Sequence, residues 1–250
     1  MKITKKRKIW ITGASSGIGR ALAVELAHRG HDLALTARRV DVLRTLRDEL
    51  SGCGVQIEVA ELDVSRPEDI PDVLDRLVES LGGLDIAIAN AGITHVHRTG
   101  DLEHLSQEYQ VIQTNVIGAI ATLNAAAVWF RRQGYGQLVG ISSVAAWLTL
   151  PGSATYCASK AALTAWLNAV RAELQPHGIQ VLSVHPGFIE TDIAPNMKRY
   201  PFVISAEKAA SSIAQALGTE TRTLVVPQWP WQYLVPVLRR IPDRLLQRMI

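Results

Sequence analysis

Cysteine is nearly absent from this chain, which has two, Cys53 and Cys157, in 250 residues. They lie far apart and lack metal-ligand spacing, so a disulfide-stabilised scaffold is excluded and a reducing compartment is the simpler interpretation. His95 and His97 could share one face of a strand, but no third ligand is near them in sequence. We therefore expect no metal site.

Neither a strong charge imbalance nor a long apolar run is present. Lys and Arg total 26 against 23 Asp and Glu, for a net charge of +3, and the basic residues are spread out without interleaved aromatics. This distribution argues against a nucleic-acid partner. No uninterrupted apolar run approaches a membrane-spanning length, and the apolar segment after the basic N-terminus breaks at Thr12-Gly13. We expect a soluble, cytoplasmic protein.

What the chain does have is a regular alternation of short apolar strands and helical segments. At 48% hydrophobic it can bury one large domain, and it is too short for two. The alternation predicts an α/β fold, a parallel sheet with helices on both faces. The predicted strands are 8–12, 32–37, 55–59 with 61–64, 84–89, 137–143, 179–184 and 223–226, and the predicted helices are about 20–29, 42–50, 67–82, 107–132, 156–174 and 206–217.

A glycine-rich turn, Gly13-Ala14-Ser15-Ser16-Gly17-Ile18-Gly19, joins the first predicted strand to its helix. Glycines let the backbone approach a ligand, and a helix N-terminus offers N–H groups and a positive dipole end to a phosphate. The spacing differs from G-x-G-x-x-G, so a tight turn that binds nothing stays as the alternative. We predict a single-domain, doubly wound Rossmann fold of about seven strands in residues 1–228.

The second predicted strand runs into Arg38 and Arg39, with no Asp or Glu from Thr36 to Arg39. In a Rossmann fold an acidic residue at this place binds the ribose diol of NAD, whereas arginine accommodates a 2′-phosphate. The pattern favours NADP(H) over NAD(H). The alternative is that both arginines are only solvated charges at a helix start.

Tyr156 and Lys160 are four residues apart in a predicted helix, so their side chains share one face. An ammonium close to a phenol favours the phenolate, and we expect it to lower the tyrosine pKa from about 10. Ser143, at the end of the apolar run from Gln137, would present its hydroxyl to a substrate oxygen. A Tyr and Lys at this spacing mean little alone, because many surface helices carry such a pair.

Taken together, these motifs resemble the short-chain dehydrogenase/reductase family, in its NADP-preferring group with a single Rossmann domain. The resemblance covers about residues 8–228. Histidine at position 185 and cysteine at position 157 depart from the family pattern without removing a family role. The motifs that carry the resemblance are the Thr12–Gly19 turn, Asn90-Ala91-Gly92, Asn115, Ser143, Tyr156, Lys160 and Pro186-Gly187.

The resemblance implies roles residue by residue. Tyr156 would be the general acid, with Lys160 lowering its pKa and bonding the nicotinamide ribose. Ser143 would polarise the carbonyl, and Asn115 would hold a water in a proton relay. NADP(H) would be bound by Tyr156 and Lys160 together with residues of the other motifs: Gly13, Ser15, Ser16, Gly17, Ile18, Gly19, Arg38, Arg39, Asp63, Val64, Asn90, Ala91, Gly92, Pro186, Gly187, Ile189 and Thr191.

The activity to be expected is reversible, NADP(H)-dependent reduction of a ketone or aldehyde to an alcohol. An apolar or lipid-like substrate is indicated because Trp147, Leu148, Leu150 and Phe188 would surround the pocket. Two alternatives stay open. Similar scaffolds host epimerases and dehydratases, and a non-enzymatic NADP-sensing protein could share the fold, although it would not need Tyr156 or Lys160.

Two surfaces carry predictions about partners. The helices at 107–132 and 156–174 are apolar around much of their circumference, which indicates a homodimer or homotetramer. Residues 229–250 form a tail with aromatics, aliphatics and four arginines, interrupted by Pro236 and Pro242. The tail is a membrane-surface attachment, a lid over an apolar substrate or a subunit contact. A peripheral membrane location is thus the alternative to a freely cytoplasmic one.

Overall fold

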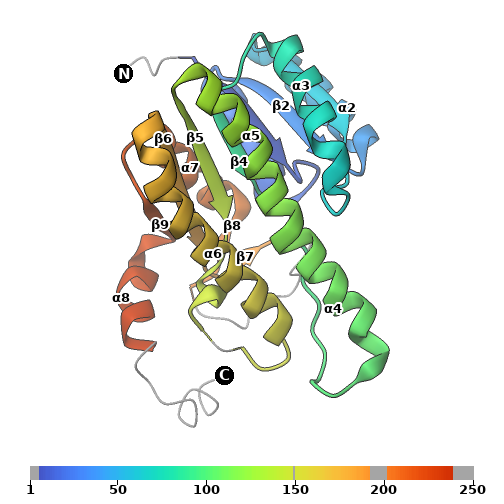
Figure 1. Ribbon diagram of the computed structural model, residues 1–250, viewed down its shortest axis with the longest axis vertical. Helices are drawn as coiled ribbons and strands as arrows, with labels where there is room; N and C mark the ends of the chain where they lie inside the picture. Colours follow the sequence, from blue (N-terminus) through green and yellow to red (C-terminus); the bar gives the residue numbers. More distant parts are fainter. Residues whose placement is uncertain (1–5, 149, 192–201, 239–250) are drawn as a thin grey trace.

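A computed structural model describes residues 6–148, 150–191 and 202–238 of the chain. Its centre is a seven-stranded parallel sheet in the order β3-β2-β1-β4-β5-β6-β9 (Figure 1). The strand order reverses between β1 and β4, and such a switch point is where open α/β sheets bind ligands. The strands are β1 (Lys8–Thr12), β2 (Asp32–Ala37), β3 (Ile57–Glu61), β4 (Ile86–Ala89), β5 (Gly136–Ile141), β6 (Ile179–Pro186) and β9 (Thr223–Val226).

Helices cover both faces of the sheet, α5 and α6 on one and α7 on the other (Figure 1). A separate parallel pair, β7 (Ile189–Glu190) and β8 (Ile204–Ser205), lies beyond the end of β6. The helices are α1 (Gly17–His28), α2 (Val40–Glu49), α3 (Ile70–Leu81), α4 (Leu105–Ile112), the π-helical η4 (Gln113–Gly118), α5 (Ala119–Gln133), α6 (Ala154–Leu174), α7 (Ala206–Ala216) and α8 (Gln228–Leu238).

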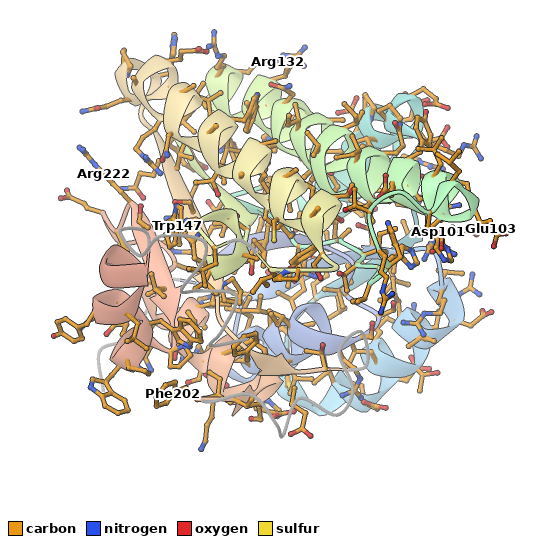
Figure 2. The ribbon with its side chains drawn as sticks, turned by 90° about the horizontal axis from the view of Figure 1, so that it is seen from below. Asp101, Glu103, Arg132, Trp147, Phe202 and Arg222 are labelled. Atoms are coloured by element: carbon orange, nitrogen blue, oxygen red, sulfur yellow. The ribbon has the colours of Figure 1, made fainter. Side chains whose placement is uncertain are left out.

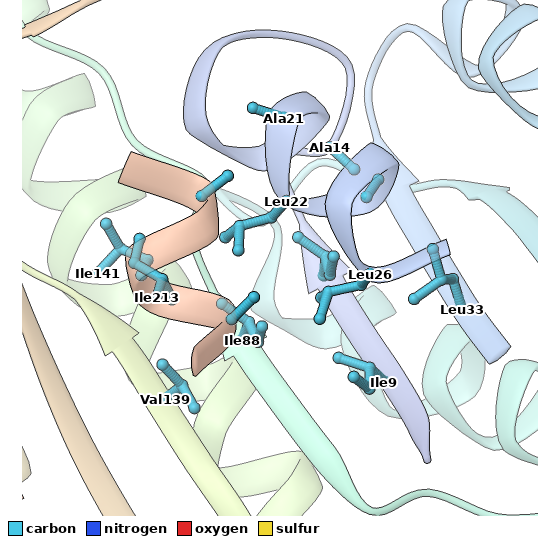
Figure 3. Packing of buried hydrophobic residues seen from close by; sticks show 14 of the residues in the cluster. Ile9, Ala14, Ala21, Leu22, Leu26, Leu33, Ile88, Val139, Ile141 and Ile213 are labelled. Carbon is cyan, nitrogen blue, oxygen red and sulfur yellow. The ribbon is translucent and has the colours of Figure 1, made fainter. Parts of the chain in front are cut away.

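Two apolar cores follow from the alternation of side chains along each strand. Ile9 and Ile11 of β1 face the core shared with α1, α2 and α7, whereas Trp10 faces the core shared with α3, α5 and α6. Figure 3 shows the first core, where Leu22 and Leu26 of α1 pack over the sheet. Strands buried on both sides explain the nearly continuous apolar runs in the sequence. The predicted α/β Rossmann fold with about seven strands is confirmed.

The predicted helix at 107–132 is in fact three segments, α4, η4 and α5. The π-helical segment forms where Asn115 and Gly118 are both buried. A Cβ atom on Gly118 would lie 2.5 Å from the backbone oxygen of Val64, so only glycine lets this segment pack against the loop after β3. Packing therefore explains why an asparagine and a glycine, which are both weak helix formers, occur in the middle of this helical stretch.

Several predicted strand bounds differ from the observed ones by one to three residues, and two of these differences follow from side chains that cap local turns. The segment 61–64 does not continue as a strand, because β3 ends at Glu61 and the Asp63 carboxylate accepts a hydrogen bond from the Ser65 amide, 3.0 Å. Similarly, β5 ends at Ile141. Ser143 is the N-cap of the 3₁₀ turn η5 (Val144–Ala146), and its Oγ accepts a hydrogen bond from the Ala145 amide, 3.1 Å. Both side chains cap local turns, and such bonds compete with strand pairing.

One helical stretch of the described residues, Leu102–Gln133, is long and apolar enough by length and composition to cross a membrane. The search for uninterrupted apolar runs missed this stretch, because polar residues interrupt it. Its mean hydropathy is high all the same. In the fold its α5 part packs on β4 and β5 and its α4 part contacts α6. Packing on the sheet accounts for part of its apolar character.

The start of the C-terminal tail belongs to the folded body. Trp231 of α8 is only 4% exposed and packs with Val144, Trp147 and Phe188. Its ring meets Phe188 edge to face, with 5.4 Å between centroids. Trp147 and Phe202 lie on the side of the molecule where α8 is found, opposite Asp101 and Glu103 (Figure 2). The predicted tail therefore contacts the domain from its first turn, and residues 239–250 lie outside the described residues.

Replacing Trp231 with alanine is expected to lower the free energy of unfolding by about 3 kcal/mol, since it removes a large buried aromatic side chain. Trp229, two residues earlier, is 69% exposed, and its alanine variant should cost about 1 kcal/mol or less. Urea unfolding followed by circular dichroism at one protein concentration measures both. Equal losses for the two variants would show that α8 is not docked as described.

Candidate active site

Nearly all the predicted site residues meet in one cavity of about 530 Å³ at the carboxyl ends of the strands. Gly19 and Asn115 are the two predicted site residues that do not line it. Its lining comes from residues within segments 13–18, 37–39, 62–64, 90–96, 141–148, 150–160 and 186–191. The predicted residues that line the cavity are Gly13, Ser15, Ser16, Gly17, Ile18, Arg38, Arg39, Asp63, Val64, Asn90, Ala91, Gly92, Ser143, Tyr156, Lys160, Pro186, Gly187, Ile189 and Thr191.

The glycine turn brings bare backbone to the floor of the cavity. Gly13 and Gly17 have φ angles of 68° and 54°, which disfavour any residue with a side chain. A Cβ on Gly13 would also lie 2.7 Å from Cα of Ala91. Ser16 is the N-cap of α1, yet its side chain makes no capping hydrogen bond. The helix N-terminus thus keeps amides for an anionic group at this end.

Gly19 lies behind this turn. A Cβ there would be 2.4 Å from the Gly13 backbone oxygen and 2.5 Å from Nδ2 of Asn90. The Gly19→Ala variant must therefore push the turn away from α1, and overpacking of this kind costs about 1–3 kcal/mol. We expect a dissociation constant for NADPH about tenfold higher, measured by fluorescence titration. The Gly52→Ala variant, where a Cβ meets nothing within 4 Å, is the control and should bind like the parent.

Asn90 locks the end of β4 to the end of β1. Its Nδ2 donates to the backbone oxygens of Thr12, 3.0 Å, and Gly13, 3.2 Å. The Thr12 hydroxyl in turn accepts from the amides of Asn90, 3.1 Å, and Ala91, 3.2 Å. These bonds cross the switch point between the strands, so Asn90 shapes the glycine turn as well as lining the cavity.

Arg38 and Arg39 lie at the rim, after the end of β2, and both side chains are exposed. The Arg39 guanidinium donates to the Ser15 hydroxyl in the glycine turn, 3.1 Å. Two cations thus border the end of the cavity that holds the helix N-terminus. That end is suited to more than one phosphate group.

The environment of Tyr156 corrects one expectation. Its pKa is raised rather than lowered, because burial disfavours the phenolate, and a hydrogen bond with the Ser143 side chain only partly offsets this. The Lys160 ammonium lies 5.8 Å from the centre of the Tyr156 ring. At that distance, in this arrangement, the cation does not outweigh desolvation. The tyrosine is therefore a protonated phenol at neutral pH.

Lys160 is a buried cation, 5% exposed, whose Nζ donates to the Ile141 backbone oxygen, 2.9 Å. Burial lowers its pKa to about 8. A Cβ on Gly92 would lie 3.4 Å from this Nζ and 3.2 Å from Oδ1 of Asn115, so these groups surround one small space. The predicted Tyr156 and Lys160 pair thus lies at the cavity with Gly92 beside it.

Asn115 is fully buried and its amide is engaged on both sides. Oδ1 accepts from the Ile93 amide, 2.8 Å, while Nδ2 donates to the Ile93 oxygen, 2.9 Å, and to Oγ of Ser159, 3.1 Å. The side chain therefore ties the π-helical segment to the loop after β4 and to α6. Its part in a water relay stays a prediction.

The other end of the cavity is apolar. Leu148, Leu150 and Phe188 line it as expected, whereas Trp147 does not line it and packs against the cluster of Val144 and Trp231. Among the described residues that line this end, Lys160 is the only one with a charged side chain. Sequence reasoning missed several lining residues, because no motif marks them: Ile93, Thr94, Val96, Thr114 and Ser153.

Two other features of the sequence, Cys157 and the His95 and His97 pair, carry no reactive or metal-binding arrangement in the described residues. Cys157 is half-buried and burial raises the pKa of its thiol, which disfavours the reactive thiolate. His97 contacts the Glu108 carboxylate, 2.6 Å, rather than pairing with His95. In the described part of the chain, no group of three or more His, Cys, Asp or Glu side chains is arranged to hold a metal.

Sequence comparisons agree with the geometry. A family model described as short chain dehydrogenase matches residues 7–200. An uncharacterized oxidoreductase of Mycobacterium tuberculosis is 37% identical over 246 residues, which cover 97% of this chain and 97% of the relative. The 11-beta-hydroxysteroid dehydrogenase 1A of Arabidopsis thaliana is 34% identical over 262 residues, covering 95% of this chain and 74% of the relative.

Solved structures have the same fold. A short-chain type dehydrogenase/reductase from Mycobacterium marinum superposes with a TM-score of 0.81 at 32% identity, covering 89% of this chain and 94% of that one. An alcohol dehydrogenase from the archaeon Thermococcus sibiricus, complexed with 5-hydroxy-NADP, also gives 0.81, at 28% identity, covering 88% of this chain and 96% of that one.

Proposed function

The chain belongs to the short-chain dehydrogenase/reductase family, and on that premise we propose that it reduces a ketone or aldehyde to an alcohol, reversibly, with NADP(H). Family membership supports an oxidoreductase enzyme that uses a nicotinamide nucleotide. The observation that carries the finer proposal is the cavity itself. The glycine turn and the hydroxyls of Ser143 and Tyr156 line this same cavity.

The residues present fit a dinucleotide. The side-chain-free floor at Gly13 and Gly17 and the uncapped start of α1 suit a pyrophosphate. Arg38 and Arg39 suit a 2′-phosphate on the adenosine ribose. Lys160, Pro186 and Gly187 would hold the nicotinamide end. Bound there, NADPH supplies the hydride.

Tyr156 and Ser143 handle the substrate oxygen in this proposal. Tyr156 is protonated at neutral pH and can give its proton to the oxygen as charge develops on it. The Ser143 side chain lies beside Tyr156, and its hydroxyl, which donates to the Pro186 oxygen at 3.3 Å, would turn to donate to the same substrate oxygen. Lys160, whose pKa near 8 keeps it mainly cationic at neutral pH, favours the phenolate left behind.

The substrate is best matched by an uncharged apolar carbonyl compound. Leu148, Leu150 and Phe188 would remove apolar substrate surface from water, which favours binding by about 25 cal/mol per Å². A carboxylate or phosphate would find few partners among the described residues at this end, since Lys160 is already bonded to Ile141. The relative called 11-beta-hydroxysteroid dehydrogenase 1A is consistent with such a substrate class.

The pH dependence of the two directions should differ. Alcohol oxidation needs the Tyr156 phenolate, whose population rises with pH because its pKa is raised above 10. Between about pH 6 and 7, where Lys160 stays mainly charged, kcat/KM for oxidation should therefore rise with pH while that for reduction stays nearly level. Initial rates in both directions measure this. An oxidation rate that falls over this range would contradict the assignment of Tyr156.

Two other activities compete with this proposal. An epimerase or dehydratase on the same scaffold would return the nucleotide to its starting redox state, so it would show turnover without net consumption of NADPH. A non-enzymatic NADP-sensing protein would bind the nucleotide and turn nothing over. Tyr156 and Lys160 at the cavity favour the enzyme over the sensor.

The test is an absorbance assay of NADPH and NADH consumption with ketones and aldehydes of graded chain length and ring size. Consumption with NADPH that strengthens as the carbonyl compound becomes more apolar is the expected result. Tight nucleotide binding with no consumption across the panel would favour the sensor. Preference for small charged substrates would remove the apolar assignment.

The assembly we propose is a homodimer or homotetramer through the helical face of α4, α5 and α6. Large apolar side chains are exposed along the α4–α5 stretch, and burying such a face in a second copy would stabilise the pair: Leu105, Tyr109, Ile117 and Val128. A cytoplasmic location is proposed. The contact of Trp231 with Val144 and Phe188, which line the cavity, favours a tail packed on the domain over membrane attachment.

A further inference from the structure

The pairing of β5 with β6 reaches its end at the active site. The last register pair is Ile141 with Val184, and one more main-chain bond runs from the Ser142 amide to the Val184 oxygen, 2.8 Å. The next bond of a parallel ladder would come from the amide of residue 186. That residue is Pro186, which has no amide hydrogen. The main-chain ladder must therefore stop one residue before Ser143.

Side chains continue the connection beyond this point. Nδ1 of His185 lies 3.2 Å from the backbone oxygen of Ser143. In return, the Ser143 hydroxyl lies 3.3 Å from the backbone oxygen of Pro186, to which it donates. These two bonds run in opposite directions between the same two segments. They hold Ser143 against the Pro186-Gly187 turn, where the main chain alone could not.

The His185 ring also holds the far end of the η5 turn. It stacks on the Trp147 indole, with 3.8 Å between centroids and 21° between planes. Ser143 is the N-cap of η5 and Trp147 is its C-cap. One side chain thus contacts both ends of the turn whose Val144 and Ala145 line the cavity.

The protonation state of His185 follows from its partners. A backbone oxygen can only accept, so Nδ1 must carry the hydrogen. Nε2 is buried and has no partner among the described residues. Burial is the main reason that the pKa of His185 falls to about 4, with Lys160 and Arg171 acting in the same direction. The ring is therefore neutral at neutral pH, in its Nδ1–H tautomer.

A histidine at position 185 would destabilise the fold if its only role were to fill space. Leaving a buried nitrogen such as Nε2 without a partner costs about 1–3 kcal/mol. A phenylalanine would stack on Trp147 without that penalty. The donor function of Nδ1 is what distinguishes histidine from the cheaper alternative.

We propose that His185 is a positioning residue for catalysis: as a neutral Nδ1–H donor stacked on Trp147, it holds η5 so that the Ser143 hydroxyl meets that of Tyr156. This inference rests on the proposed function, because it assigns Ser143 to the substrate oxygen. It adds a residue that acts through Ser143 and touches neither substrate nor nucleotide.

Two substitutions separate the donor from the ring. The His185→Phe variant keeps the ring and loses the donor, and it should lower kcat about tenfold while the dissociation constant for NADPH changes less than twofold. The His185→Asn variant keeps an N–H near the Nδ1 position, and it should recover most of kcat. Equal loss in both variants, or a loss confined to KM, would overturn the proposal.

A double-mutant cycle shows whether His185 acts through Ser143. In the Ser143→Ala background, His185→Phe should lower kcat no further, because the hydroxyl to be positioned is gone. Effects that multiply independently would overturn the proposal. Absence of carbonyl turnover by the parent protein, or Ser143→Ala with full activity, would instead defeat the proposed function.

A measurement on the parent protein keeps the proposal testable if the variants do not fold. Nitrogen-15 shifts of the histidine ring distinguish the two neutral tautomers from the cation. We expect His185 as the neutral Nδ1–H tautomer at pH 7. The Nε2–H tautomer, or a cationic ring at that pH, would overturn the proposal.

Discussion

Replacing Tyr156 with phenylalanine is expected to lower kcat for carbonyl reduction about a thousandfold, because general acid catalysis contributes roughly 10²–10⁴ to rate. The change removes one hydroxyl and keeps the ring, so the surroundings of α6 stay packed. Ser143 can still bond the substrate oxygen, but it loses the neighbouring phenol. NADPH absorbance under saturating substrate, with a single-turnover experiment for the chemical step, measures the loss.

The control for this variant is Tyr109→Phe. Tyr109 is 67% exposed on α4 and does not line the cavity, so its hydroxyl should have no effect on turnover. Binding of NADPH to Tyr156→Phe should stay within about threefold of the parent. A Tyr156→Phe enzyme that keeps more than a tenth of the parent activity would show that another group supplies the proton.

Exchanging Arg38 and Arg39 together for alanine is expected to lower kcat/KM with NADPH about a hundredfold and to change it with NADH less than threefold. Hydrogen bonds to a charged group contribute about 1.5–3 kcal/mol each, and about 1.4 kcal/mol corresponds to a factor of ten. Two such bonds to a 2′-phosphate would account for the loss. NADH has no such phosphate, so the arginines have nothing to bind on it.

A matched control uses two other exposed arginines of the same region. Arg44 and Arg47 lie on α2, do not line the cavity and pair with Asp41 and Asp48 at the surface. Their double alanine variant should leave the ratio of the two cofactors unchanged. A parent enzyme that prefers NADH, or equal losses with both nucleotides after the Arg38 and Arg39 exchange, would show that these arginines are only solvated charges.

Several elements were predictable because local pattern and tertiary environment agree. β1, β2 and β9 begin and end at the predicted residues, since each opens on a polar residue and then runs through mostly apolar residues. The glycine turn could also be predicted from the sequence, because its backbone conformation requires glycine. Positive φ at Gly13 and Gly17 is a backbone requirement that only glycine meets at low cost.

Other features depend on residues far apart in the sequence. The end of β5 could not be placed, because Pro186, more than forty residues later, interrupts the ladder. The partners of Trp231 likewise come from two other segments. No local pattern around Ser143 or Trp231 carries that information.

The sequence alone determined the order of strands and helices, the glycine turn and the set of residues able to carry the chemistry, because periodicity, backbone conformation and functional-group type are local properties. Only the tertiary structure decided in which direction the Tyr156 pKa moves. The direction depends on the burial of the phenol and on the 5.8 Å between the Lys160 ammonium and the centre of the Tyr156 ring. The tertiary structure also decided what holds Ser143, since His185 and Trp147 meet only after β6 has been laid beside β5. Burial and contacts between distant segments are properties of the packed chain, and they set the electrostatics of the site.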